Sequence, residues 1–165
     1  LLGWGRRGPY TGNYFLQKAF SFYPLHPLHP CAFMPLPFEP LTAQILAAAF
    51  EVSGELGVGF VESVYEGAMF LALKSRGLEV ARQVPIKVHF KGELVGHFIA
   101  DLVVDDTVVV ELKAVKVLLS EHHAQVLNYL KATGKPVALL INFGNPKLEF
   151  RRFDHRFEKS ESEQG

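Results

Sequence analysis

From residue 41 onward, hydrophobic and polar positions repeat along the chain with two different periods. Apolar residues three and four positions apart predict helices at about 43–55, 60–75 and 120–132. Runs rich in valine, isoleucine and leucine, bounded by turn-forming residues, predict strands. These strands lie at about 78–82, 84–90, 94–104, 108–113, 137–142 and 147–153. Thr42 and Ser120 are the expected N-caps of the first and third helices.

Three of the expected strands are apolar at successive positions rather than at alternate ones. They are residues 97–104, 108–113 and 137–142. Strands of this kind are usually covered on both faces. Together with the order of helices and strands, this predicts an α/β fold in which a mixed central β-sheet is flanked by α-helices on both faces.

The two ends of the chain differ in composition from its middle. Residues 1–40 are rich in glycine and proline without a helical or strand period, and we expect an irregular or disordered leader there. His26 and His29 lie in repeated Leu-His-Pro units, which we interpret as solvated rather than as a metal site. A single domain over 41–155 and a flexible tail at 156–165 complete the expected organisation.

Composition limits the function classes that fit the chain. Among 165 residues, 17 are Lys or Arg and 17 are Asp or Glu, so no global basic field attracts nucleic acid. The single cysteine, Cys31, excludes an internal disulfide framework and favours a cytoplasmic location. No apolar run reaches the roughly 18 residues of a membrane span. Basic residues that can reach a phosphate backbone, interpreted mostly as solvated, are Lys74, Arg76, Arg82, Lys116, Lys131, Arg151 and Arg152.

The stretch 101–113 places charged residues inside an apolar hairpin. A three-residue loop at 105–107, with aspartates as turn residues, pairs Val104 with Val108 and puts Asp101 opposite Glu111. Alternation along the strand puts Glu111 and Lys113 on one face. Converging carboxylates in apolar surroundings favour a divalent cation held by oxygen ligands. The alternatives are a structural carboxylate at Asp101 and an exposed ion pair at the strand end.

Two helices add polar residues at helical spacing. Glu62, Tyr65 and Glu66 share one side of the second helix, which alone is typical of a solvated face. The preceding Gly57-Val58-Gly59 favours a more buried Glu62.

On the third helix, His122, Gln125 and Tyr129 share a face, and they fit either a binding site or the polar edge of an amphipathic helix. Phosphate-binding loops, dinucleotide fingerprints and serine-nucleophile elbows are absent from the sequence.

These motifs resemble those of a known group of proteins. The segment Gly59-Phe60-Val61-Glu62-Ser63-Val64-Tyr65 is similar to the signature of the GxxExxY proteins. In chain order, Asp101, Glu111-Leu112-Lys113 and Gln125-x-x-x-Tyr129 resemble the motifs of the PD-(D/E)XK nuclease superfamily. The resemblance covers about 41–155. It implies a restriction-endonuclease-like core in which Glu62, Asp101 and Glu111 surround Mg²⁺ or Mn²⁺.

The same resemblance implies roles for the remaining motif residues. Lys113 corresponds to the motif lysine, and Gln125 and Tyr129 match an element of the exonuclease-like branch. We therefore expect a metal-dependent nuclease that hydrolyses phosphodiester bonds in nucleic acid, with DNA favoured over RNA. The alternatives are a catalytically inactive binding or accessory module on the same fold, and a polar set that is only structural.

Overall fold

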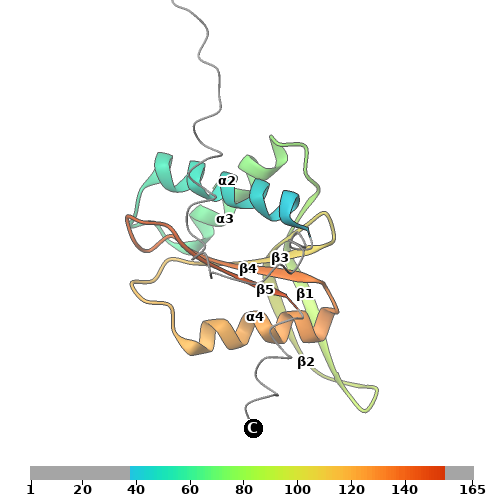
Figure 1. Cartoon of the computed structure of the whole chain (residues 1–165). Coiled ribbons are helices and arrows are strands. Elements are labelled where there is room, and N and C mark those ends of the chain that lie inside the picture. Colours follow the sequence, from blue (N-terminus) through green and yellow to red (C-terminus); the bar gives the residue numbers. More distant parts are fainter. Residues whose placement is uncertain (1–37, 155–165) are drawn as a thin grey trace, which may run out of the picture. The chain divides into compact units, whose positions relative to one another are not determined.

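A computed structural model describes residues 38–154 (Figure 1). Several sequence-based expectations therefore lie outside the described residues. They concern residues 1–37 of the expected leader, including His26, His29 and Cys31, and the tail at 156–165.

The described part contains three helices and one five-stranded sheet. The helices are α2 (Glu39–Leu56), α3 (Glu62–Lys74) and α4 (Ser120–Thr133). The strands are β1 (Val80–Phe90), β2 (Glu93–Val104), β3 (Val108–Lys113), β4 (Val137–Asn142) and β5 (Glu149–Asp154). None of these helices is long and apolar enough to cross a membrane.

The sheet is mixed, and helices cover both of its faces. The strands lie side by side in chain order, with β3 and β4 parallel and all other neighbours antiparallel. Figure 1 shows α2 and α3 above the sheet and α4 below it. The α/β fold with a sheet between helical layers is therefore confirmed.

Alternation along the central strands creates two separate cores. On the α2 and α3 side, Leu102 and Val110 pack with Ile45 and Tyr65. On the α4 side, Val109 and its neighbours pack against buried residues of that helix. Successive residues point to opposite faces of a strand. This explains why β3 and β4 are apolar at every position.

Two helix starts differ from the expectation. Helix α2 begins at Glu39, with Phe38 as its N-cap and Pro40 in its first turn, where proline needs no amide hydrogen. Thr42 therefore lies inside the helix, and its hydroxyl donates to the Glu39 carbonyl at 3.0 Å. At α4 the N-cap is Leu119, and Ser120 is the first helical residue.

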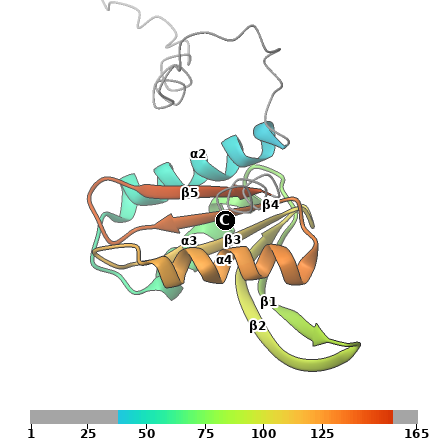
Figure 2. The same cartoon turned by 60° about the horizontal axis from the view of Figure 1, so that its bottom comes forward.

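The expected strands at 78–82 and 84–90 form one continuous strand, β1. Gln83 adopts a positive φ of 50° without ending the strand. Pro85 is tolerated because β1 lies at the edge of the sheet, where a missing amide hydrogen costs little. Figure 2 shows β1 and β2 continuing together as a hairpin that projects beyond the rest of the sheet.

Candidate active site

The hairpin between β2 and β3 has the expected register near its turn, but the expected pairing of Asp101 with Glu111 is not formed. Val104 pairs with Val108, and pairing continues as far as Leu102 with Val110. Asp105 and Asp106 both have φ 48°, and the Thr107 amide donates to the Val104 carbonyl at 2.9 Å. The interpretation of these aspartates as turn residues is confirmed.

Asp101 lies where β2 leaves β3, one position beyond the last pair. Its Oδ2 accepts a hydrogen bond from the Leu112 amide at 2.8 Å, so the carboxylate replaces a backbone acceptor. Asp101 also has no partner on β1, where the opposite position is occupied by Gln83. Ala100 packs toward α4 whereas Leu102 packs toward α2 and α3, so the chain turns over at Asp101.

Glu111 and Lys113 share a face of β3, as expected, and form a close ion pair. Glu111 is only 3% exposed, and its Oε1 lies 2.7 Å from the Lys113 Nζ. The alternative of an exposed ion pair is therefore wrong. Glu111 Oε2 is buried and has no hydrogen-bond partner among the described residues.

Helix α4 supplies the groups beside Glu111. The Tyr129 hydroxyl lies next to the Glu111 carboxyl, but it donates its single proton to the Ile99 carbonyl at 3.1 Å. Gln125 Nε2 in turn donates to the Tyr129 oxygen at 2.6 Å. His122 does not join them, because its Nδ1 accepts a hydrogen bond from the Leu119 amide. Gln125 and Tyr129 thus reach the site, whereas His122 does not.

The site holds more negative charge than the protein neutralises. Burial, followed by the neighbouring charge of Asp101, raises the pKa of Glu111 to about 7. Burial also raises the pKa of Asp101, against the Leu112 hydrogen bond. For Lys113, burial lowers the pKa, but the hydrogen bond to Glu111 and the surrounding carboxylates outweigh it, so the pKa is raised. A bound cation would relieve this repulsion.

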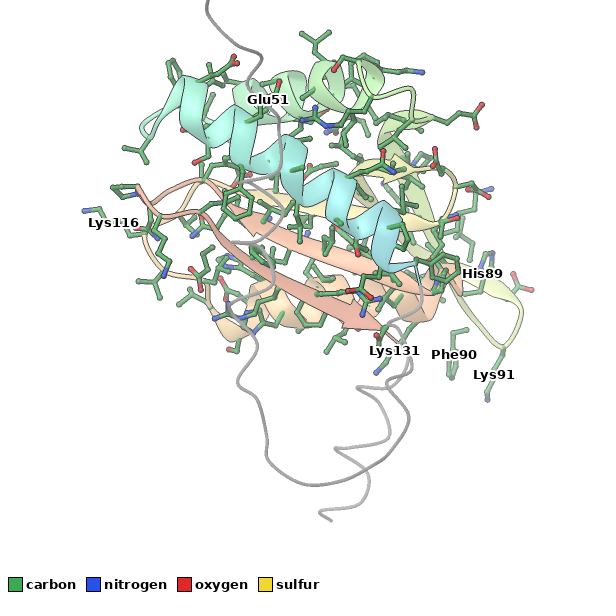
Figure 3. The ribbon with its side chains drawn as sticks, turned by 45° about the horizontal axis from the view of Figure 1, so that its top comes forward. Glu51, His89, Phe90, Lys91, Lys116 and Lys131 are labelled. Atoms are coloured by element: carbon green, nitrogen blue, oxygen red, sulfur yellow. The ribbon has the colours of Figure 1, made fainter. Side chains whose placement is uncertain are left out.

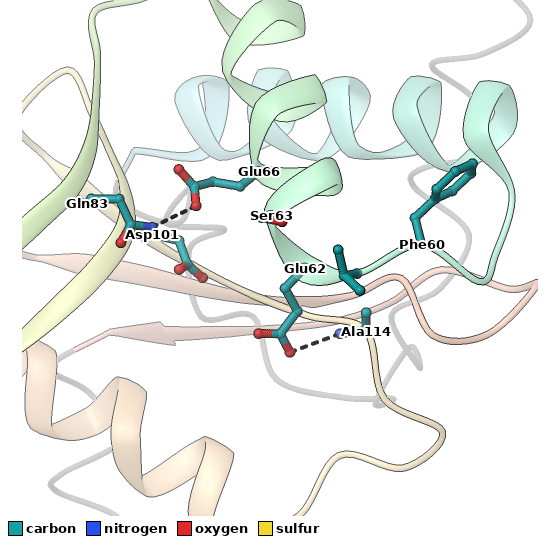
Figure 4. A pocket seen from close by; sticks show the side chains of 8 residues that line it. Phe60, Glu62, Ser63, Glu66, Gln83, Asp101 and Ala114 are labelled. Carbon is teal, nitrogen blue, oxygen red and sulfur yellow. Dashed lines mark hydrogen bonds between the residues drawn. The ribbon is translucent and has the colours of Figure 1, made fainter.

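Helix α3 presents two glutamates with opposite environments (Figure 4). Glu62 is exposed, and its Oε1 accepts a hydrogen bond from the Ala114 amide at 3.3 Å. The expectation of a more buried Glu62 is wrong, since Glu66 takes the buried position. Glu66 binds Arg82 Nε at 2.7 Å and Gln83 Nε2 at 2.6 Å.

Tyr65, the last residue of the Gly59-x-x-Glu62-x-x-Tyr65 spacing, has a structural role. The buried Tyr65 hydroxyl donates to the Gly57 carbonyl at 2.9 Å and accepts from the Phe60 amide at 3.4 Å. Its ring stacks on Phe143 with centroids 4.6 Å apart. Tyr65 therefore fixes the loop that leads into Glu62.

Asn142 and Gly144, at the end of β4, hold Val115 in place, and we call this set of contacts the clamp. The sequence did not predict that these residues support the site. Asn142 is fully buried, its Oδ1 accepts from the Val115 amide at 3.0 Å, and its Nδ2 donates to the Val115 carbonyl at 2.8 Å. Gly144 packs so closely on Val115 that a Cβ would overlap its backbone. The only sequence signal is a polar residue and a glycine at the end of a buried strand. The clamp holds the segment that follows Lys113.

An open pocket lies beside these groups on the α3 side of the sheet. Asp101, Glu62, Glu66 and Gln83 all reach it (Figure 4). The complete lining is Phe60, Val61, Glu62, Ser63, Glu66, Gln83, Asp101 and Ala114. Glu111 and Lys113 do not line this pocket: they share the face of β3 that carries Val109, on the α4 side, where Glu111 lies beside Tyr129.

The donor set fits a hard divalent cation, although it is not a preformed three-residue cage. Within residues 38–154, no three His, Cys, Asp or Glu side chains are grouped closely enough to hold an ion. Asp101 and Glu111 do interact, and Glu111 Oε2 is a buried acceptor without a donor. Such carboxylate oxygens are the ligands that Mg²⁺ and Mn²⁺ prefer.

We expect metal affinity to depend strongly on pH. Because the pKa of Glu111 is raised from 4.5 to about 7, a cation must displace a proton below pH 7. Mg²⁺ affinity should therefore rise about tenfold per pH unit up to about pH 7 and then level off. Without metal, stability changes in the opposite direction. The folded protein binds the Glu111 proton more tightly than the unfolded chain does, so Glu111 contributes less stability as pH rises through this range.

Isothermal titration of Mg²⁺ between about pH 5.5 and 7.5 would measure this dependence. Affinity that stays constant across the range would contradict a role for the Glu111 carboxylate as a ligand.

Comparison with known proteins points to one family. Residues 39–153 match the family described as the PD-(D/E)XK nuclease superfamily. The chain is also similar to the protein in a solved structure described as "Crystal structure of SSO0001", with a TM-score of 0.46 and 16% identity. That similarity covers 71% of this chain and 59% of the other chain. Among curated proteins, none matches the chain.

Proposed function

The chain belongs to the PD-(D/E)XK nuclease superfamily, and from this premise we propose that it is a metal-dependent nuclease that hydrolyses phosphodiester bonds in nucleic acid. DNA is the favoured substrate. The Gly59-x-x-Glu62-x-x-Tyr65 spacing supports placing it among the GxxExxY proteins. The proposal includes a cytoplasmic location.

The observation that carries the proposal is the state of the Glu111 carboxyl. One oxygen is held by Lys113, and the other is buried without a hydrogen-bond donor beside a second acidic group, Asp101. A purely structural carboxylate would normally have both oxygens satisfied, as Glu66 has. The unmatched oxygen therefore argues for a ligand that enters the site.

In the proposed mechanism, Asp101 and Glu111 would hold Mg²⁺ or Mn²⁺, and Glu62 would add a carboxylate from α3. When bound, the ion would supply an activated water and neutralise charge on the phosphate. Lys113 uses one ammonium hydrogen on Glu111 and has others to orient the attacking water and stabilise phosphate oxygens. Gln125 and Tyr129 would help to position the Glu111 carboxyl.

A catalytically inactive binding or accessory module is the second candidate. It is favoured by the exposure of Glu62 and by the absence, within residues 38–154, of a ready three-residue metal group. Titration with Mg²⁺ and Mn²⁺ separates the two candidates. An inactive module would show no binding at millimolar ion.

The nuclease proposal is tested by a cleavage screen with linear, nicked, single-stranded and flapped DNA and with RNA, in Mg²⁺ or Mn²⁺. We expect Lys113→Met to lower cleavage at least about 100-fold, because the charge that stabilises the transition state is lost. Lys135→Met is the matched control. Lys135 is also a mostly buried lysine, but it lies between α4 and β4 and its Nζ binds Asp106 of the hairpin turn at 2.6 Å. Equal activity of the two variants would refute the assigned role of Lys113.

A further inference from the structure

The hairpin formed by the outer parts of β1 and β2, residues 86–99, projects from the sheet and is here called the arm (Figure 2). Its exposed side chains include several large apolar groups: Phe90, Leu94, Val95, Phe98 and Ile99. Phe90, at 64% exposed, lies with Lys91 at the tip (Figure 3). Such a concentration of exposed apolar groups on a projecting element is typical of a binding surface.

The two faces of the arm differ. On one face Ile86, together with Ala100 just beyond the arm, packs into the core between the sheet and α4. Lys87 pairs with His97 across the strands, so both lie on the opposite face, the one toward α3. Since α3 carries Glu62 and Glu66, this basic face lies on the pocket side of the sheet.

The lysines of the arm are not neutralised by the protein. Among residues 38–154, neither Lys87 nor Lys91 is ion-paired with a carboxylate, and Lys91 Nζ lies 5.4 Å from the Phe90 ring centre. In contrast, four of the arginines are paired. Glu93 is the only acidic residue of the arm. The protein has no net charge, so this local surplus is what a polyanion would meet.

We propose that the arm holds the phosphate backbone of the nucleic-acid substrate, with Lys87 and His97 near the pocket and Lys91 with Phe90 at the far end. This inference rests on the proposed function for the nature of the partner. Lys87 is four residues from the pocket residue Gln83, about 13 Å along an extended strand. Lys91 is eight residues from Gln83, at most about 26 Å along the chain, which is the length of about eight base pairs of duplex.

A second copy of the chain fits the arm less well. The edge strand β1 would be the surface for pairing between sheets, but Pro85, the left-handed Gln83 and the unpaired Lys87 all oppose strand addition. The exposed apolar groups can instead contact sugars and bases, while the lysines contact phosphates.

The test measures binding of the full chain to labelled DNA by fluorescence anisotropy in EDTA, so that cleavage is not required. Duplex and single-stranded DNA of about 20 nucleotides are both used, at several salt concentrations. We expect Lys87→Glu and Lys91→Glu each to weaken binding about tenfold at low salt and to reduce the salt slope by about one. Melting curves verify that each variant is folded.

Lys74→Glu is the matched control, because it changes the net charge equally. Lys74 ends α3, at the opposite end from Glu62. Equal losses for Lys74→Glu and Lys87→Glu would overturn the inference, as would a dimer in light scattering that Lys87→Glu dissociates. If neither the parent protein nor any variant cleaved nucleic acid, but Lys87→Glu and Lys91→Glu still weakened DNA binding, only the nuclease proposal would be defeated.

Discussion

Asp101→Asn is expected to abolish cleavage, by about 10³-fold or more, while leaving the fold as stable as before or more stable. The asparagine oxygen can still accept the hydrogen bond from the Leu112 amide, so the fork between β2 and β3 is retained. Only the negative charge is lost. Since burial raises the pKa of Asp101, that charge opposes folding, and its removal relieves repulsion with Glu111.

Cleavage rates with Mg²⁺ and thermal melting in EDTA check the two halves of this prediction. Asp106→Asn is the matched control, since Asp106 belongs to the same hairpin but its side chain is 94% exposed at the turn. A stable Asp101→Asn protein with parental activity would remove Asp101 from the mechanism. Loss of stability together with activity would indicate that Asp101 is structural.

Gly144→Ala should have the largest effect on stability. Its Cβ would overlap the backbone of Val115, and neither segment can move freely because Asn142 ties them together. We expect a loss of about 3 kcal/mol or more in the free energy of unfolding, since backbone overlap in a packed region cannot be relieved by a rotamer change. Metal binding should also weaken, because the displaced segment follows Lys113 directly.

Denaturant unfolding of Gly144→Ala and Gly54→Ala checks this prediction. Gly54 lies in helix α2 and has open space around its Cβ position, so alanine there should stabilise the protein by about 0.5–1 kcal/mol. If Gly144→Ala were as stable as the parent protein, the clamp would not be rigid.

Local sequence patterns predicted the part of the fold that depends on near neighbours. The apolar runs of β3 and β4 indicated a sheet covered on both faces. The polar break at Asp105 and Asp106 indicated the register that pairs Val104 with Val108. That register brought Asp101 to the end of the paired region, close to Glu111. Both results depend only on strand alternation and the length of one turn.

Features that depend on distant segments were not predictable in this way. Helical spacing puts Glu62 and Glu66 on one side of α3, but Glu66 is the one that binds Arg82 and Gln83 of the distant strand β1 and is buried. The bond of Asn142 to Val115 joins residues 27 positions apart. No local pattern encodes such a pairing. The predicted start of α2 at Thr42 is wrong because the helix already begins at Glu39, with Pro40 in its first turn.

The length of the tight turn at 105–107 determines which residues of β2 and β3 lie opposite each other. Side chains alternate strictly along a strand, so one residue inserted there would exchange the two sides of β3 relative to β2. Every acidic group would remain in the sequence, yet Asp101 would no longer meet Glu111. Homologues or engineered variants with an altered loop length can therefore lose function without any change at the residues that perform it.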